Sequence, residues 1–291
     1  MIKGSITAIV TPFKDGQVDE TALGNFIDWQ IENGTHGLVP CGTTVEAPTL
    51  TLDEHKRVIS ICVETAAGRV PVIAGAGSNA TRVAVSYAQY AKTLGADAAL
   101  VVTPYYNKPS QEGIYQHFKS ITDTVDIPVI VYNIPGRSVV DITNETMARL
   151  SKLPHIIGVK DATGDISRVT SLADMCGTDF IQLSGDDPTS LGYRAHGGHG
   201  CISVGSNIAP RLYSDFHKAV DAVDFTQARK LHHQLDRLHK DLFIDPSPAP
   251  TKYGLSLMGK MEPDVRLPIT PCRESTKPHV KAAMIRAGIN I

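Results

Sequence analysis

The stretch IIGVKDATG, from Ile156 to Gly164, is the part of the chain that decides the fold. Four apolar or small residues lead directly to Lys160, and a continuous run of this kind is typical of a strand that is covered on both faces, as in a parallel sheet. Lysine is rarely buried, and burial disfavours its charged form. A neutral amine at the end of such a strand can attack a carbonyl and form a Schiff base. The alternative is a lysine that extends to solvent or pairs with Asp161.

Seven other short apolar runs lie along the chain, with helical patterns between them. They begin at Ile6, Gly37, Val70, Ala98, Pro128, Phe180 and Gly200. Strands that alternate with helices in this way form parallel βαβ units, and eight units predict a closed α/β barrel, the (β/α)8 TIM barrel. The rival architecture is a doubly wound open sheet, which would need fewer units or a reversal of strand order.

The segments between these runs each show one apolar helical face, which we expect to pack in the core. One such face consists of Val83, Tyr87, Tyr90, Ala91 and Leu94. Thr51 and Glu54 have the spacing of a capping box and predict the start of another helix.

The pattern changes after the eighth run, because no further strand is predicted. A long charged helix is followed by the proline-rich break DPSPAP at Asp245 and by two more helical stretches. We therefore divide the chain into a barrel at residues 1–224 and an all-helical C-terminal extension at residues 225–291. Three histidines on the long helix are expected to be solvated: His232, His233 and His239.

The bulk composition indicates a soluble, cytoplasmic protein that binds neither nucleic acid nor membranes. The 291 residues carry a net charge of −2, and the five cysteines are scattered without any C-x-x-C pair, so neither a disulfide framework nor a zinc site is predicted. No apolar run approaches the length of a membrane span. His196 and His199 lack a third ligand at a suitable spacing, so we expect no metal and no cofactor.

The residues that directly follow barrel strands meet at one face of the barrel. Besides Lys160, the side chains and backbone groups placed there are Thr43, Thr44, Tyr105, Tyr106, Tyr132, Arg137, Gly185 and Ile202. An amine nucleophile needs a proton shuttle, which tyrosine and threonine hydroxyls can form, and a guanidinium can bind a carboxylate with two hydrogen bonds. This set predicts a Schiff-base enzyme that acts on carboxylates. Glycines after the last two strands leave a phosphate site as a minor alternative, without basic residues to support it.

Four motifs give the chain a family resemblance over nearly its whole length: CGTT, TPYYNKPSQEG, YNIPGRS and GVKDATGD. The chain resembles the dihydrodipicolinate synthase family of class I aldolases, to which N-acetylneuraminate lyase is related. The resemblance implies a TIM barrel with a C-terminal helical domain, usually assembled as a dimer of dimers. It also implies a reaction of pyruvate with L-aspartate 4-semialdehyde, in the diaminopimelate route to lysine.

The resemblance also implies a role for each matched residue. Lys160 would form the Schiff base with pyruvate, and Tyr132 would donate and accept protons beside it. Thr43 and Tyr106 would complete the proton relay, with Tyr106 reaching in from a neighbouring subunit. Four further residues would hold or border the substrates: Thr44 and Ile202 at the pyruvate carboxylate, Arg137 at the carboxylate of the semialdehyde, and Gly185 through its backbone.

The chain departs from the family pattern in the turn that follows CGTT. Val45 replaces the glycine of the usual G-T-T-G-E, and Ala47 and Pro48 replace a small polar pair. A β-branched residue is strained at positive φ, so either the turn is built differently or the carboxylate pocket is reshaped.

Some members of the family bind free L-lysine in a cleft between subunits. His55, Asn79 and Tyr105 match that pattern here, as the remnant of a lysine site. Val83 stands where sensitive members have a glutamate, and Leu52 replaces a polar residue, so weak or absent feedback by lysine is predicted. The alternative is that Glu46 or Glu54 supplies the missing carboxylate.

Two other functions remain open at this point. One is a related aldolase, such as a sialic-acid or sugar-acid lyase, although Arg137 favours a carboxylate over a sugar chain. The other is a barrel that only binds ligands, for which the combination of Lys160, Tyr132 and Thr43 would have no use.

Overall fold

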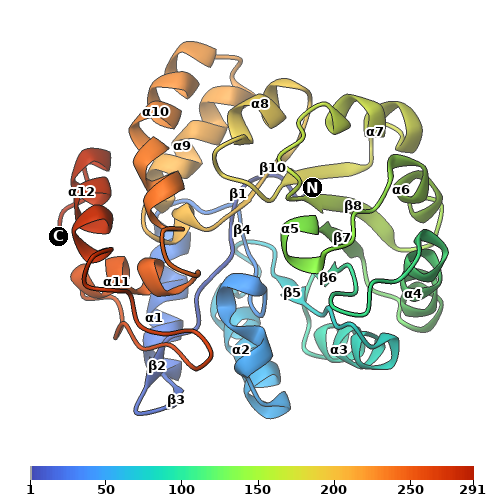
Figure 1. Ribbon diagram of the computed structural model, residues 1–291, viewed down its shortest axis with the longest axis horizontal. Coiled ribbons are helices and arrows are strands. Elements are labelled where there is room, and N and C mark those ends of the chain that lie inside the picture. The colour runs from blue at the N-terminus through green and yellow to red at the C-terminus, as the bar shows by residue number, and fades with distance from the viewer. Residues whose placement is uncertain (1) are drawn as a thin grey trace.

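Eight parallel strands form a nearly closed barrel, surrounded by helices (Figure 1). The computed structural model describes residues 2–291, except for the side chain of Val45. The barrel strands are β1 (Gly4–Thr7), β4 (Gly37–Leu38), β5 (Ile73–Gly75), β6 (Ala98–Val102), β7 (Val129–Asn133), β8 (Ile156–Asp161), β9 (Ile181–Ser184) and β10 (Gly200–Ser203). Each falls within or overlaps one of the eight predicted runs, and the barrel prediction is confirmed.

The strand order is that of a barrel and excludes the doubly wound sheet. It runs β4-β1-β10-β9-β8-β7-β6-β5, with every pairing in this sheet parallel. The two end strands approach each other through a bridge between Leu38 and Val72 and through a 3.0 Å hydrogen bond from Leu38 N to the Pro71 carbonyl. Both faces of β6 and β7 are buried, which is why these strands are continuous apolar runs rather than alternating ones.

Helices follow the strands as the apolar periodicity predicts. Those of the barrel are α1 (Glu20–Glu32), α2 (Leu52–Ala66), α3 (Thr81–Thr93), α4 (Gln111–Thr124), α5 (Pro135–Ser138), α6 (Asn144–Leu150), α7 (Arg168–Cys176), α8 (Ser190–Ala195) and α9 (Pro210–Asp221). The predicted capping box is present, since Thr51 and Glu54 bond each other's backbone N–H at the start of α2. Three short 3-10 turns complete this part: η1 (Thr43–Val45), η2 (Ala47–Thr49) and η3 (Gly205–Asn207).

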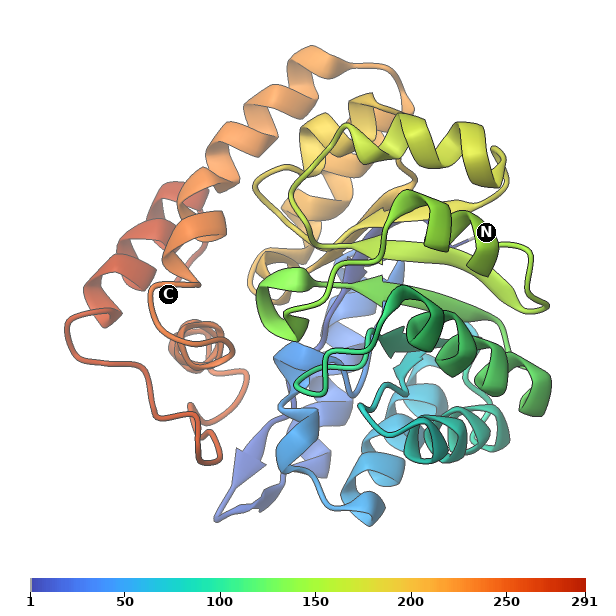
Figure 2. The same cartoon turned by 45° about the vertical axis from the view of Figure 1, so that its right-hand side comes forward.

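The C-terminal extension is helical and lies along one flank of the barrel (Figure 2). It contains α10 (Phe225–Asp241), α11 (Ala249–Leu257) and α12 (Lys277–Ala287). The division at residues 224 and 225 stays a prediction; it falls at Asp224, whose side chain caps α10. No helix within residues 2–291 is both long and apolar enough to cross a membrane.

One element was not predicted, and one local prediction is wrong. The sequence did not indicate the small antiparallel hairpin of β2 (Phe13–Lys14) and β3 (Gln17–Val18), because its strands are only two residues long. Of the three histidines predicted in solvent, only His233 is exposed, and His232 is half-buried. His239 is buried at 3% exposure, with its ring 5.8 Å from that of Tyr213. Its helix packs against α9 and α12, so more of its surface is covered than its charged composition suggested.

Candidate active site

Lys160 lies near the end of β8, beside Tyr132 of the neighbouring strand β7. The two residues are direct partners in the sheet register, and both are buried, at 6% and 5% exposure. The Lys160 Nζ lies 4.1 Å from the centre of the Tyr132 ring. The backbone of Tyr132 is fixed by Thr103, whose N–H and hydroxyl both donate to the Tyr132 carbonyl, at 2.9 and 3.0 Å. A buried amine is thus held against an aromatic ring on a rigid part of the barrel.

Gly185 gives the Lys160 side chain the space that it occupies. A Cβ atom at residue 185 would lie 2.9 Å from Cε of Lys160 and 2.8 Å from Cβ of Ala162, closer than real contacts allow. The Gly185 N–H also donates to the carbonyl of Asp161, the residue after the lysine. The structure therefore places Gly185 beside Lys160.

The turn that carries Thr43 and Thr44 borders a cavity of about 440 Å³. Thr43 is exposed and lines this cavity together with Tyr132, while Thr44 is buried. The turn approaches β5 so closely that a Cβ atom at Gly75 would lie 1.9 Å from the carbonyl oxygen of Cys41. Glycine at position 75 is thus a condition for bringing the threonine turn to the barrel mouth.

The turn at Val45 has a left-handed residue directly after the valine. Val45 lies within η1, and its side chain is outside the described residues. Glu46, the next residue, adopts the left-handed conformation with φ of 58°. The turn is therefore built with its positive φ at Glu46.

Arg137 borders both the first cavity and a second one. It lies on the short helix α5 and lines both cavities, the second of which is also bordered by Gly185. Its side chain is exposed and, among residues 2–291, no hydrogen bond or ion pair holds its guanidinium. Ser138, by contrast, is fully buried and ties the loop together by donating to the carbonyls of Ile134 and Val140. The loop is thus anchored, while its cation stays available to an anionic ligand.

Five of the predicted residues line neither cavity: Thr44, Asn79, Tyr106, Lys160 and Ile202. Tyr106 is 89% exposed and has a φ of 74°, so its ring points out of the molecule. Ile202 is buried in the barrel interior, in the same apolar cluster as Tyr132 and Leu183. Tyr105, in contrast, lines the first cavity.

The predicted lysine-site residues are only partly brought together. His55 is buried, lines the first cavity and stacks on Tyr87, with the ring centres 4.5 Å apart. Burial lowers the pKa of His55 to about 4, although a hydrogen bond with the Gly75 backbone opposes this shift. Asn79 is half-buried, and its carbonyl accepts a hydrogen bond from Asn107. Tyr87 packs against the core, as predicted, and also lines the cavity.

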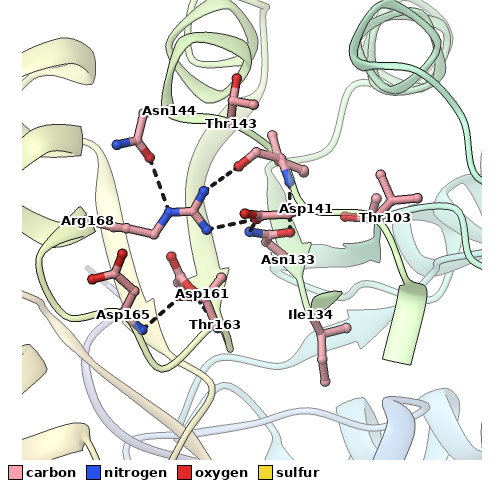
Figure 3. Close-up of polar contacts among 12 residues, drawn as sticks. Thr103, Asn133, Ile134, Asp141, Thr143, Asn144, Asp161, Thr163, Asp165 and Arg168 are labelled. Atoms are coloured by element: carbon pink, nitrogen blue, oxygen red, sulfur yellow. Dashed lines mark hydrogen bonds and ion pairs between the residues drawn. The ribbon is translucent and has the colours of Figure 1, made fainter. Parts of the chain in front are cut away.

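A polar cluster anchors the far end of the Arg137 loop beside the two central strands (Figure 3). Oδ1 of Asp141 accepts from Nδ2 of Asn133 at 2.7 Å and from the guanidinium of Arg168 at 2.8 Å. Arg168 also donates to the Ile142 carbonyl, and Oδ1 of Asn133 accepts from the Ile142 N–H. Because Asn133 directly follows Tyr132, this cluster joins the loop to the strand that carries the ring. We call it the loop clasp.

Asp161, which follows Lys160, lies next to the loop clasp. Burial raises its pKa, while hydrogen bonds from Thr163 and the charge of Arg168 oppose the shift. The sequence did not single out this cluster, because Asp141 and Arg168 are 27 residues apart and belong to no common motif.

The residues that the structure describes contain no group of three or more histidine, cysteine or acidic side chains placed to hold a metal ion. The histidines of AHGGHG make local contacts instead. The His199 ring accepts from the Gln182 N–H at 3.0 Å, and the His196 ring lies 2.9 Å from the Gly192 carbonyl oxygen.

Comparison with known proteins shows which family this chain is similar to. Residues 1–287 match the dihydrodipicolinate synthetase family. The 4-hydroxy-tetrahydrodipicolinate synthase of Bradyrhizobium diazoefficiens is 58% identical over 287 residues, which cover 99% of this chain and 97% of the relative. Two solved structures share the fold across the full length. The chloride-inhibited dihydrodipicolinate synthase of Acinetobacter baumannii, complexed with pyruvate, is 46% identical with a TM-score of 0.97 and covers 100% of both chains. That of Cyanidioschyzon merolae with lysine bound is 35% identical with a TM-score of 0.95 and covers 99% of both.

The family match spans nearly the whole chain, and it accords with the barrel and with the position of Lys160 beside Tyr132. The chain belongs to the dihydrodipicolinate synthetase family.

Proposed function

We propose that this chain is a 4-hydroxy-tetrahydrodipicolinate synthase, which condenses pyruvate with L-aspartate 4-semialdehyde. Its relatives in Bradyrhizobium diazoefficiens and Parvibaculum lavamentivorans, 58% and 55% identical, carry this name. The observation that carries the proposal is the buried Lys160 amine, 4.1 Å from the centre of the Tyr132 ring. Its neighbours Tyr132 and Gly185 each line one of the two cavities. A Schiff-base lyase needs this combination of a desolvated amine, a neighbouring hydroxyl and an open substrate site.

In the first half of the reaction, Lys160 Nζ attacks C2 of pyruvate and forms a carbinolamine. The hydroxyl of this adduct leaves as water after it takes a proton, and we assign the supply of that proton to the Tyr132 hydroxyl. Loss of a proton from C3 of the resulting imine then gives an enamine. Thr43 lines the same cavity, and its hydroxyl passes protons between Tyr132 and the solvent.

In the second half, C3 of the enamine attacks the aldehyde carbon of the semialdehyde and forms the new C–C bond. The alkoxide that results takes up a proton through the same tyrosine. The amino group of the semialdehyde then attacks C2, closes the ring and displaces the Lys160 amine, which is regenerated. The products are the heterocycle and the water released in the first half.

The two carboxylates are assigned to different parts of the site. The backbone N–H groups and hydroxyl of the turn at Thr44, with the backbone at Ile202, hold the carboxylate of pyruvate. Arg137 binds the carboxylate of the semialdehyde, because it is a cation at the junction of both cavities without a partner within residues 2–291. A sugar-acid substrate would place hydroxyls there instead, so the free guanidinium favours the semialdehyde.

We further infer that the protein is a homotetramer, a dimer of dimers, in which Tyr106 completes the proton relay of a neighbouring subunit. The exposure of this aromatic side chain supports the assignment, since 89% of it faces outward in the single chain. Its positive φ of 74° costs free energy, which an intersubunit contact would offset.

The central test is to trap the imine. The protein is incubated with pyruvate, reduced with borohydride, digested and examined by mass spectrometry. We expect a single adduct, on Lys160, and none in a Lys160→Arg variant. Lys252 is an internal control, because it is also buried but its amine is ion-paired. An unmodified Lys160, or an adduct at another lysine, contradicts the proposal. Assay of the wild type with a panel of aldehydes then separates the semialdehyde from sugar-derived substrates.

A further inference from the structure

A fully buried ion pair joins the threonine turn to the C-terminal extension. Glu46 follows η1, and Lys252 lies on α11; their side chains are 1% and 0% exposed and 2.6 Å apart. Burial lowers the pKa of Lys252 from 10.5 to about 8, while Glu46 raises it, so the amine remains charged at neutral pH. Removing two charges from water costs several kcal/mol, so the pair calls for an explanation beyond stability.

The remaining hydrogen-bonding capacity of the pair is used by one segment of the extension. Oε2 of Glu46 accepts from the Arg266 N–H at 2.9 Å. Nζ of Lys252 donates to the Asp264 carbonyl at 2.7 Å and lies 4.1 Å from the centre of the Phe13 ring. The Glu46 carboxylate is therefore bound from both sides, by directional contacts that come entirely from the C-terminal extension.

The Arg266 side chain extends this contact across the turn. Its guanidinium donates to Glu54 at 2.5 and 2.8 Å, and to the carbonyls of Thr49 and Gly16 at 3.1 and 2.8 Å. Glu54 belongs to the capping box of α2, so the second helix of the barrel is tied in as well. The chain after α11 passes close to this end of α2 (Figure 1).

The backbone of Glu46 explains why its position matters to the cavity. Its φ of 58° and ψ of 33° are left-handed, and this conformation costs about 1–2 kcal/mol for a residue other than glycine. Such a strained backbone conformation persists only where contacts with the surrounding residues hold it in place. Glu46 is the junction between η1 and η2, and the arms that leave it on either side line the cavity, through Thr43 before it and Ala47 after it.

We infer that Glu46 is a positioning residue for the turn that binds the pyruvate carboxylate, and that Lys252 and Arg266 of the C-terminal extension hold it in place. The inference rests on the proposed function. According to this inference, the C-terminal extension contributes to the affinity for pyruvate, although it does not contact the reacting atoms. A purely stabilising contact would not need charges, because a buried pair can often be replaced by apolar residues at equal or better stability. Directional hydrogen bonds, in contrast, fix where the carboxylate and its backbone lie.

The test uses Glu46→Gln, which keeps the shape of the side chain but removes its charge. Because the two half-reactions are separate, kcat/KM for each substrate reports its own half. We expect kcat/KM for pyruvate to fall about tenfold, since displacements below 1 Å are enough for such losses, while kcat/KM for the aldehyde stays unchanged. Borohydride trapping at limiting pyruvate should fall in parallel. The control is Asp236→Asn, which breaks an exposed pair with Lys240 in the same extension and should alter neither value.

The double variant Glu46→Gln/Lys252→Met separates positioning from stability. Lys252→Met removes the buried cation that Glu46→Gln leaves without a partner. The double variant should therefore fold even if the single variant does not, so that its kinetics can be measured. We expect it to regain thermal stability but to keep the low kcat/KM for pyruvate. If it has the wild-type value for pyruvate, or if both substrates lose equally, the pair is only structural and the inference is overturned. A wild type that traps no pyruvate imine would instead overturn the proposed function, and the inference with it.

Discussion

Arg137 is the cation that we propose to bind the second substrate, the semialdehyde. Replacing it with alanine removes a charge-assisted pair, which is worth about 1.5–3 kcal/mol, or about 10- to 150-fold. We expect this loss in kcat/KM for the aldehyde, whereas kcat/KM for pyruvate and the rate of imine trapping change little. The measurement is a steady-state matrix over both substrates. An equal loss for both would mean that Arg137 supports the loop rather than the substrate.

Val83 is the single side chain on which the prediction of weak feedback by lysine depends. It is half-buried on α3 and carries no charge to pair with the ammonium of the ligand. The sequence left open that Glu46 or Glu54 takes this role. Both carboxylates are already engaged, the first by Lys252 and the second by Arg266. Neither carboxylate is therefore free to pair with the ammonium of a lysine ligand.

We therefore predict little inhibition by lysine below millimolar concentrations. Val83→Glu should increase the affinity for lysine, by about 10- to 150-fold if a full charge-assisted pair forms. Inhibition curves for the wild type and the variant provide the check, with Val83→Gln as the uncharged control. Strong inhibition of the wild type at sub-millimolar lysine would refute the prediction.

At the scale of elements, the loop clasp connects α7 and β7 with the loop that carries Arg137. Asp141 is the acceptor shared by Asn133 and Arg168, and its side chain is 49% exposed, so its ion pair stabilises the fold by only about 0–1 kcal/mol. Loss of the carboxylate should therefore leave the barrel folded and loosen the loop.

We expect Asp141→Asn to lower kcat/KM for the aldehyde several-fold more than for pyruvate, with a small change in Tm. Asp174→Asn, on the exposed face of α7, is the matched control and should be neutral. Arg168→Lys should behave like Asp141→Asn, because an ammonium cannot reproduce the guanidinium fork that reaches Asp141 and Ile142 together. Unchanged aldehyde kinetics in both variants would show that the clasp does not position Arg137.

At the scale of the whole molecule, the exposed Tyr106 predicts an active site shared between subunits. Lys160→Ala and Tyr106→Phe are each expected to be nearly inactive alone. Mixed by co-expression or refolding, they should recover activity, because one site of each hybrid dimer then combines an intact lysine with an intact tyrosine from the other chain. Random mixing of an isologous dimer gives about a quarter of the wild-type activity. No recovery, despite hybrids detected by native mass spectrometry, would place Tyr106 in its own subunit's site or outside the reaction.

The sequence by itself determined the barrel, since each of the eight strands is a local apolar run and the chain order of strands and helices leaves one closed topology. It also placed Lys160 at a strand end, and Thr43, Tyr132, Arg137 and Gly185 on the same face, because strand ends converge in this fold. These predictions depend only on periodicity and connection length, which are local properties.

Tertiary structure alone decided which distant side chains meet. Glu46 and Lys252 are 206 residues apart, and the pairing depends on how α11 packs against the barrel. Tyr87 was indistinguishable from a core residue, because a helical stripe does not show where a cavity interrupts the packing. Arg168 and Asp141 likewise meet only because α7 and the loop after β7 lie side by side. Long-range pairs leave no local pattern, since the free energy that selects them arises from desolvation and packing of the assembled elements.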